Sequence, residues 1–250
     1  MPFFERAGLK LSYFEVGHGP PVLLIHGWGG RARRQWHKTI AALHRHYHFY
    51  ALELRGHGHS QEVRDPDYDW QDLVDDCEAL RSLAGCERWT VVGYSFGGLV
   101  GLHYAALYPE RVAAVCAVSP MMVPRSFAFV MRHLRLPVAW LLRLARTLPP
   151  SLSGKLAHNV AKTRLRTLFH TVDMMHEWEP KTTKIPPSVP VIILIGDHDR
   201  SAHGERILGV APRVEVRILE DTGHFPLWQQ RQRFVRELHE ILALHARSGA

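Results

Sequence analysis

The sequence predicts an α/β protein with a mostly parallel central sheet, helices on both of its faces, and one helical insertion. Short runs rich in Val, Ile and Leu recur along the chain, and longer helical patterns lie between them. The runs are continuously apolar, as is typical of strands buried on both faces. The chain has 250 residues, of which 46% are hydrophobic and 22% charged, which is an ordinary globular composition.

The expected strands and helices alternate along most of the chain. The strands are expected at 22–25, 49–54, 90–94, 112–118, 189–195 and 214–219. The helices are expected at about 33–45, 69–84, 96–108 and 226–246, with Asp69 as the N-cap of the second. This alternation predicts βαβ units with right-handed crossovers. Residues 3–6 and 10–16 precede them and predict an antiparallel edge hairpin that turns at Ala7 and Gly8.

The alternation breaks between Met121 and Pro187. This stretch shows no strand pattern, contains Pro137, Pro149 and Pro150 as breakers, and is rich in Leu, Met, Arg and His. We therefore expect a core domain formed by residues 1–120 and 187–250, with a helical cap at 121–186.

Charge is concentrated in this expected cap. The chain carries a net charge of +7, and residues 121–185 hold eleven Lys and Arg against three acidic side chains. The basic segment is interpreted either as a solvated helical surface or as a contact for an anionic partner. Such a partner would be an acidic carrier protein or an anionic lipid surface. Nucleic acid is not expected, because no nucleic-acid-binding motif accompanies the charge.

Several classes of protein are disfavoured by what the sequence lacks. The longest apolar run in the insertion is seven residues, at 136–142, and a bilayer span needs about 20, so no transmembrane helix is expected. The N-terminus has no apolar stretch of a secretory signal, and the three cysteines form no CxxC pair, which favours a cytoplasmic protein. The histidines at 44, 46 and 48 have no local carboxylate or cysteine partner, so no metal site is expected. The oligomeric state is not predicted.

The segment Gly-Tyr-Ser-Phe-Gly-Gly at 93–98 is the most specific feature of the chain. It follows the expected strand 90–94 and opens the expected helix 96–108. A serine on so sharp a turn has a strained backbone and a hydroxyl exposed above the sheet edge, and small residues are needed on either side of it. Ser95 is therefore the candidate nucleophile.

The segment His-Gly-Trp-Gly-Gly at 26–30 follows the expected strand 22–25. Its glycines allow the backbone to fold over the nucleophile, so that the amide of Trp28 can face a developing oxyanion. The amide of Phe96, directly after the serine, is the second expected donor.

A nucleophilic serine needs a base and an acid that orients the base. His224 is the candidate base because it follows the last expected strand, on a loop that would end above the same sheet edge. The acid should follow the preceding strand, where Asp197 and Asp199 both stand. We favour Asp199 as the acid, with Asp197 capping the turn. The order Ser, Asp, His along the chain suits the α/β-hydrolase arrangement.

These motifs resemble those of the α/β-hydrolase fold superfamily, in its branch of single-chain bacterial carboxylesterases and lipase-like serine hydrolases. The matching pieces are HGWGG at 26–30, ELRGHGHS at 53–60, GYSFGG at 93–98, GDHD at 196–199 and GHFP at 223–226. The resemblance implies a catalytic triad of Ser95, Asp199 and His224, oxyanion amides from Trp28 and Phe96, and a helical cap. Glu53 stands where the family usually has Asp, at a structural position. A serine nucleophile disfavours haloalkane dehalogenases and epoxide hydrolases, which use Asp there.

The resulting expectation is a serine esterase that cleaves carboxylic esters with short-to-medium acyl groups and needs no cofactor. Side chains near the cap and the base are expected to line the substrate pocket: Met121, Met122, Phe127 and Phe225. The same triad could also hydrolyse methyl esters or thioesters on an acyl carrier protein, monoacylglycerols or lysophospholipids, or carbon–carbon bonds. A non-enzymatic binding module is the alternative outside enzymes.

Overall fold

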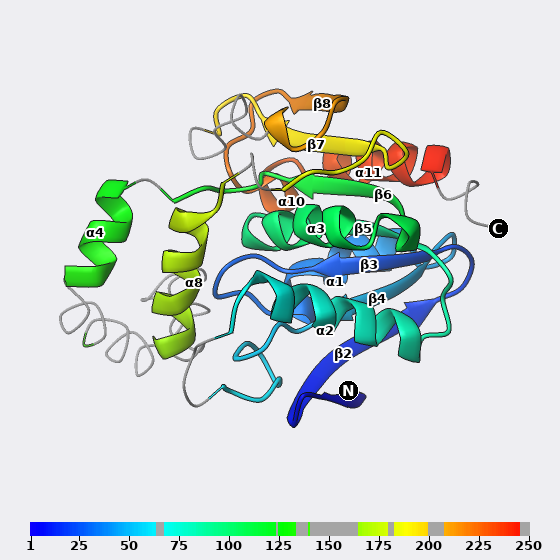
Figure 1. The fold of residues 1–250 in the computed structure, drawn as a ribbon. Helices are drawn as coiled ribbons and strands as arrows, with labels where there is room; N and C mark the ends of the chain where they lie inside the picture. Colours follow the sequence, from blue (N-terminus) through cyan, green and yellow to red (C-terminus); the bar gives the residue numbers. More distant parts are fainter. Residues whose placement is uncertain are drawn as a thin grey trace.

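The computed structural model describes residues 1–63, 68–123, 125–133, 140, 165–179, 183–199 and 208–245. Its strands form one sheet in the order β1-β2-β4-β3-β5-β6-β7-β8 (Figure 1). Their bounds are β1 Phe3–Arg6, β2 Leu9–Gly17, β3 Pro21–Ile25, β4 His48–Leu52, β5 Trp89–Tyr94, β6 Val112–Val118, β7 Val191–Gly196 and β8 Val214–Leu219. This arrangement confirms the predicted fold class.

The first two strands form the predicted antiparallel hairpin at one edge of the sheet. Ala7 and Gly8 both have positive φ, of 50° and 73°, as a tight hairpin turn requires. β2 also runs antiparallel to β4, whereas every pairing from β4 to β8 is parallel. The carboxyl ends of these parallel strands therefore meet at one edge of the sheet.

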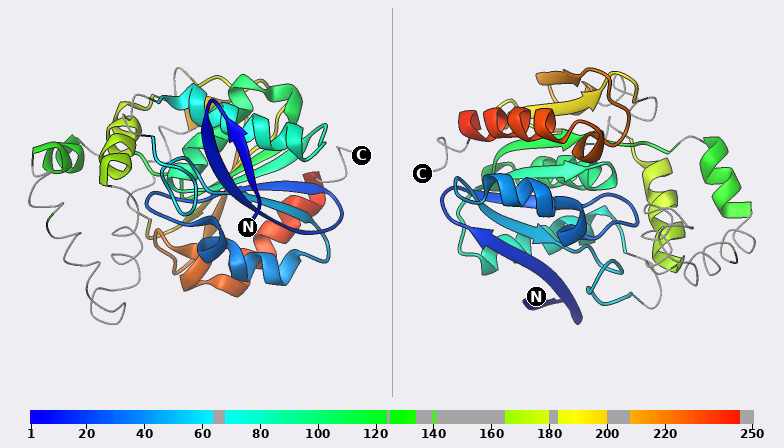
Figure 2. Two further views of the ribbon diagram at one scale, coloured as in Figure 1. Left: turned by 90° about the horizontal axis from the view of Figure 1, so that it is seen from below. Right: turned by 180° about the vertical axis from the view of Figure 1, so that it is seen from behind.

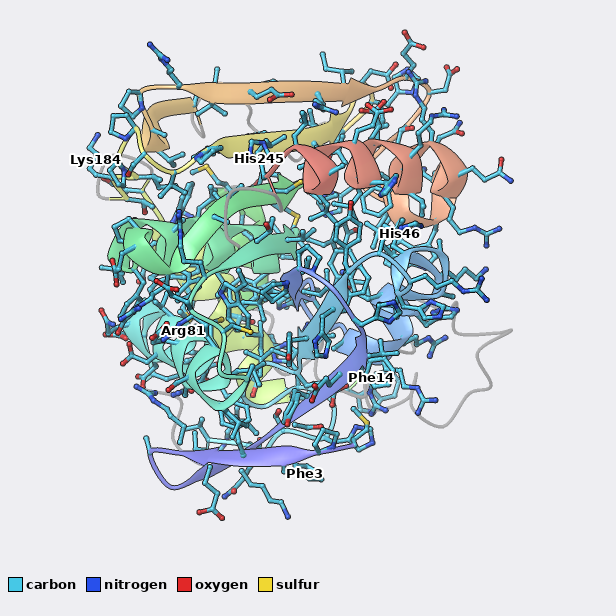
Figure 3. All side chains as sticks on the ribbon, turned by 90° about the vertical axis from the view of Figure 1, so that its right-hand side faces the viewer. Phe3, Phe14, His46, Arg81, Lys184 and His245 are labelled. Atoms are coloured by element: carbon cyan, nitrogen blue, oxygen red, sulfur yellow. The ribbon has the colours of Figure 1, made fainter. Side chains whose placement is uncertain are left out.

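Helices cover both faces of the sheet (Figures 1 and 2). On one face lie α1 (Ala32–Leu43) and α11 (Arg231–His245), and on the other lie α2 (Trp70–Leu83) and α3 (Phe96–Leu107). The sequence of β3 is apolar at every position because both of its faces are buried. Val22 and Leu24 pack in the core under α1 and α11, and Leu23 and Ile25 pack in the core under α2 and α3. Figure 3 shows the two layers from the side, with His46 near α1 and α11 and Arg81 on α2 across the sheet.

Most element bounds agree with the predicted ones, and the differences have local causes. The fourth strand ends at Leu52 rather than at residue 54, because the Leu54 amide donates to the His26 ring, at 3.1 Å. β7 begins at Val191 because Val189 closes a turn on the Pro186 carbonyl, at 3.1 Å, and Pro190 has no N–H.

The predicted helix at 226–246 is two helices, α10 (Pro226–Gln229) and α11, which are separated at Gln230. The predicted N-cap of α2 is confirmed. The Asp69 side chain accepts from the Asp72 amide, at 3.1 Å, and the Asp72 side chain accepts from the Asp69 amide, at 3.3 Å.

A buried ion-pair network joins β1, α2 and the loop that follows β4. Arg55 donates two hydrogen bonds to the Asp76 carboxylate, at 2.8 and 2.7 Å, and both side chains are almost fully buried. Arg6 of β1 reaches Asp72 on the same helix, at 2.8 Å. In the same loop Glu53 is buried and accepts from the His59 amide, at 2.6 Å, which agrees with a structural role at this position.

Two helices of the expected cap are described, α4 (Arg125–His133) and α8 (Leu165–Glu177). They pack against each other beyond the carboxyl ends of the parallel strands, on the left in Figure 1. The Trp28 indole N–H donates to the Leu168 carbonyl of α8, at 3.1 Å, and so joins α8 to the loop after β3.

The described parts of 121–186 contain helix and no strand. Arg135, Arg143 and Arg146 of the basic segment lie outside the described residues, so the cap boundaries and its charged surface stay predictions. In the described ranges, no helix has the length and apolarity that crossing a bilayer would require.

Candidate active site

Ser95 occupies a sharp turn between β5 and α3. Its backbone has φ 53° and ψ −116°, which is a strained conformation for a residue with a side chain. The turn is held from the neighbouring strand, because the Ser95 amide donates to the Val118 carbonyl of β6, at 2.8 Å. Ser95 is 3% exposed, so its hydroxyl lies in a site largely closed to bulk water.

The glycines that flank this turn are required by close backbone approaches. A Cβ on Gly93 would overlap the Gly97 carbonyl, and a Cβ on Gly97 would overlap the carbonyls of Ile25 and His26. The turn therefore packs directly against the end of β3. This contact brings the loop after β3 beside Ser95.

The structure brings Ser95, His224 and Asp199 together at the carboxyl edge of the sheet. The Ser95 Oγ lies 3.1 Å from Nε2 of His224, and Nδ1 of His224 lies 3.0 Å from Oδ2 of Asp199. The Asp199 side chain is 1% exposed. With a neutral imidazole, Nδ1–H donates to Asp199 and Nε2 accepts from the serine hydroxyl. This is the tautomer that a general base at Nε2 needs.

Asp197 contacts the loop of His224 rather than its ring. Its carboxylate accepts from the amides of Asp221 and Thr222, at 3.1 and 2.9 Å. The hydrogen bond from the Thr222 amide lowers the pKa of Asp197. Gly196 is needed beside it, because a Cβ there would overlap the Thr222 carbonyl. The loops after β7 and β8 are thus fastened to each other.

The loop after β3 is fixed by two buried side chains. The Gln35 side chain accepts from the Gly27 amide, at 3.2 Å. His26 donates from Nδ1 to the Gly27 carbonyl, at 2.8 Å, and accepts at Nε2 from Leu54. Burial lowers the pKa of His26 to about 3, so the ring stays neutral and can make both bonds.

This loop and the start of α3 present the two expected oxyanion amides. The Gly30 amide closes the turn on the Gly27 carbonyl, at 2.9 Å, and the Trp28 amide lies between them, outside that bond. Phe96 is the first residue of α3, so its amide has no acceptor within the helix. The two amides come from the segments that Gly97 holds in contact.

A pocket of about 590 Å³ opens at this site. It is lined by Trp28, Gly29, Gly30, Arg31, Arg34, Gln35, Tyr94, Ser95, Met121, His224, Phe225 and Trp228. Two of the predicted pocket residues, Met121 and Phe225, line it. Met122 is buried in the core and Phe127 is 42% exposed on α4, so the structure does not bring these two to the pocket.

Several residues that line the pocket were not predicted from the sequence. Tyr94 precedes the serine, and its hydroxyl donates to the His224 carbonyl, at 3.0 Å. Trp228 packs against the Tyr94 ring edge to face. Arg31, Arg34 and Gln35 follow the 26–30 motif directly, and that adjacency is the signal that could have found them.

Within the described residues, no three His, Cys, Asp or Glu side chains gather into a possible metal site. His26 and His57 have ring centroids 5.0 Å apart, and burial lowers the pKa of both, of His57 to about 4.

Known proteins share this fold and parts of this sequence. A Mycobacterium tuberculosis protein named as uncharacterized is 27% identical, in a match that covers 91% of this chain and 76% of the relative. The pimeloyl-[acyl-carrier protein] methyl ester esterase of Aliivibrio fischeri is 34% identical, but over only 44% of this chain and 40% of its own length. The crystal structure of a hydrolase from Pseudomonas aeruginosa superposes with a TM-score of 0.80 at 19% identity, and covers 96% of this chain and 97% of that one.

A family model shows which family the chain belongs to. The model of the alpha/beta hydrolase family matches residues 22–237, from β3 into α11, and so spans Ser95, Asp199 and His224. The resemblance drawn from the motifs is therefore confirmed, and the chain belongs to the α/β-hydrolase family.

Proposed function

We propose that the protein is a serine hydrolase that cleaves carboxylic esters with short-to-medium acyl groups, through an acyl-enzyme on Ser95. The observation that carries the proposal is the continuous chain of contacts from the Ser95 Oγ through His224 to Asp199, at 3.1 and 3.0 Å. Ser95 and His224 also line a pocket that is large enough for a small ester.

The first half-reaction forms the acyl-enzyme. His224 Nε2 takes the hydroxyl proton as the Ser95 Oγ attacks the ester carbonyl carbon, and the carbonyl oxygen becomes an oxyanion. Asp199 holds the imidazole in its tautomer and stabilises the imidazolium. The imidazolium then gives its proton to the leaving alkoxide, and the alcohol departs.

The second half-reaction repeats these steps with water. His224 removes a proton from a water molecule, the hydroxide attacks the acyl carbon, and the acid leaves as Ser95 regains its proton. The Trp28 and Phe96 amides serve as the oxyanion donors in both halves. One such donor contributes a factor of about 10²–10³ to the rate in related chemistry.

The size and lining of the pocket support small acyl groups. Its volume is about 590 Å³, and aromatic and thioether side chains line it, among them Trp28, Met121 and Trp228. Pockets for small molecules span roughly 300–1,000 Å³, and the alcohol part of the ester must share the space with the acyl chain.

The relatives' names support an ester bond and keep other substrates open. One relative is named for a methyl ester on an acyl carrier protein, and another, from Metapseudomonas resinovorans, for a dienoic acid that is hydrolysed. Each of these matches covers less than half of the chain. Carrier-bound esters, lipid monoesters and carbon–carbon bonds are therefore outcomes of the test.

A series of 4-nitrophenyl esters from acetate to palmitate tests the proposal. We expect turnover that peaks at short or medium chains and is lost in Ser95→Ala, with a far-UV spectrum and Tm like those of the wild type. A peak at long chains would favour a lipid substrate. No Ser95-dependent turnover on any ester would overturn the esterase, and carrier-bound esters and carbon–carbon bonds would be tested next.

A further inference from the structure

We infer that the pocket selects esters that carry a negatively charged group, which Arg31, Arg34 and Gln35 bind. The inference rests on the proposed esterase function and specifies its substrate class. The charged group is a carboxylate or a phosphate, since both present anionic oxygens to the same donors.

Two arginines line the pocket that contains Ser95. Arg31 is partly buried and Arg34 is exposed, and no Asp or Glu is among the lining residues of this pocket. A second pocket of about 530 Å³ is lined by Met1, Arg31, Arg33, Arg34, His37, Glu53 and His59. Arg31 and Arg34 therefore line both pockets, and the second pocket has more basic than acidic lining residues.

Arg31 and Arg34 are not paired with an acidic side chain in the described part of the protein. Neither Arg31 nor Arg34 makes an ion pair with a described residue. α1 has no acidic residue in its first turn, and its N-cap Arg31 makes no side-chain capping bond. Cations at a helix N-terminus face the positive end of the helix dipole. The unpaired arginines, the lack of acidic residues in the first turn and the helix dipole together raise the electrostatic potential at the pocket. This potential favours an anion there.

Gln35 provides an independent observation beside the two cations. Its side chain is 7% exposed and lines the same pocket, and its Oε1 accepts from the Gly27 amide, at 3.2 Å. That bond fixes the orientation of the amide group, and the Nε2 donor is buried without a partner. A buried donor without an acceptor is costly, and an anionic oxygen of the substrate would satisfy it.

Gln35 also ties this charged region to the reacting centre. The Gly27 amide that it holds belongs to the loop that carries the Trp28 amide. A substrate with its carbonyl at Trp28 and its charged group at the arginines would lie along one continuous wall of the pocket. The anion would position the ester as well as add affinity.

Matched pairs of esters test the inference. On the acid side, monomethyl adipate is compared with the methyl ester of adipic acid monoamide, which has the same length and no charge. On the alcohol side, acetylated glycerol phosphate is compared with acetylated glycerol. For each pair we measure the ratio of kcat/KM for the charged ester to that for the neutral one, in Arg31→Gln/Arg34→Gln and in the wild type.

We expect the wild type to prefer the charged ester in at least one pair, and the double variant to lower that ratio by at least tenfold, through KM. Arg33→Gln is the control, because Arg33 lies on the same helix, carries the same charge and does not line the active-site pocket. This variant should leave the ratio of charged to neutral kcat/KM within twofold of the wild type. The pair that shows the preference identifies a carboxylate on the acid or a phosphate on the alcohol.

Two results would overturn the inference. One is a wild type that hydrolyses both members of each pair equally well. The other is a double variant that slows charged and neutral esters by the same factor. In both cases hydrolysis of the neutral esters that requires Ser95 would leave the esterase proposal intact, whereas its absence would contradict that proposal instead.

Discussion

Asp197 and Asp199 leave the end of β7 two residues apart, and their carboxylates reach different groups of the His224 loop. Asp199 accepts from the imidazole, whereas Asp197 accepts from two backbone amides. One carboxylate therefore contacts the ring of the proposed base, His224, and the other holds the loop that carries it. The chemical similarity of the two residues makes them a matched pair for mutation.

We expect Asp199→Asn to lower kcat by about 10³–10⁴, because an asparagine amide favours the wrong tautomer of the histidine. Asp197→Asn keeps an acceptor oxygen near Thr222 and should lower kcat by less than tenfold. The measurement is kcat on the best 4-nitrophenyl ester, with Tm as the control for folding. If the larger loss fell on Asp197, the assignment of the acid would be wrong.

Among single residues, those predicted from the sequence are the ones that a single strand places at the edge of the sheet. Ser95 directly follows a predicted strand and His224 lies on the loop after the last one, and the sheet edge then brings them together. The choice between Asp197 and Asp199 depended on the backbone conformation of the loop after β7, which decides which of the two carboxylates faces His224. Gln35 could not be predicted, because its pocket contact depends on how α1 packs against the loop after β3.

The turn between β5 and α3 is held by backbone contact, which makes it sensitive to a single methyl group. A Cβ on Gly93 would overlap the Gly97 carbonyl and the next amide. Backbone atoms cannot move aside as a flexible side chain can. The strand and the helix would therefore have to separate.

We expect Gly93→Ala to destabilise the protein by about 3 kcal/mol or more, at the upper end of overpacking effects, and to abolish esterase activity. Gly209→Ala is the control, because a Cβ there has no neighbour within 4 Å. Urea unfolding and yield of folded protein measure both variants. Equal stability of the two would contradict the close approach at Gly93.

The Arg55–Asp76 pair gives a second prediction at the scale of elements, because it joins the loop after β4 to α2. Burial raises the pKa of Asp76 although Arg55 bonds to it, which shows how costly its charge is without a partner. We expect Arg55→Leu to cost about 3–5 kcal/mol. The double variant Arg55→Leu/Asp76→Leu should recover part of that loss, as measured by thermal unfolding. A double variant less stable than Arg55→Leu would contradict this account.

Element bounds were predictable where propensity decides and not where a distant group does. The N-cap Asp69 acts within its own turn, and its position was predicted correctly. β4 ends early because the His26 ring takes the Leu54 amide, and the two residues are far apart in the sequence. When a distant side chain takes a backbone amide in this way, the sequence near the strand end contains no signal of it.

Across the whole molecule, buried histidines link stability to pH. Burial lowers the pKa of His26 to about 3 and those of His57 and His103 to about 4. In the unfolded chain the same side chains titrate near 6.5. As the pH falls below 6.5 the unfolded chain takes up protons that the folded protein does not, so their stabilising contribution is complete above 6.5 and is lost toward 4.

We expect the free energy of unfolding to fall by about 1 kcal/mol per pH unit for each of these histidines between pH 6 and 4.5. Urea unfolding at several pH values measures the slope. His57→Phe should reduce it by the share of one histidine, whereas His198→Asn, at a side chain 70% exposed, should not change it. A slope that His57→Phe leaves unaltered would contradict a neutral buried His57.

The strand order of the sheet illustrates the limit of pattern analysis at the scale of the molecule. Local patterns predicted the strands and their alternation with helices, but β3 lies between β4 and β5 for reasons that no single segment contains. No strand order was predicted from the sequence; the resemblance of the motifs to a known family implied the fold class alone. A set of motifs in a fixed order carries topological information that hydrophobic periodicity lacks.

The hydrogen bond between the Trp28 indole and the Leu168 carbonyl has a consequence for how the two layers of the site respond to each other. The backbone amide of Trp28 is a proposed oxyanion donor, and its side chain binds α8. Linkage between two equilibria is reciprocal, so the free energy by which α8 steadies the Trp28 loop equals that by which the loop steadies α8. Any ligand that orders the Trp28 loop therefore orders α8 as well, and a change in α8 reaches the candidate site through the same hydrogen bond.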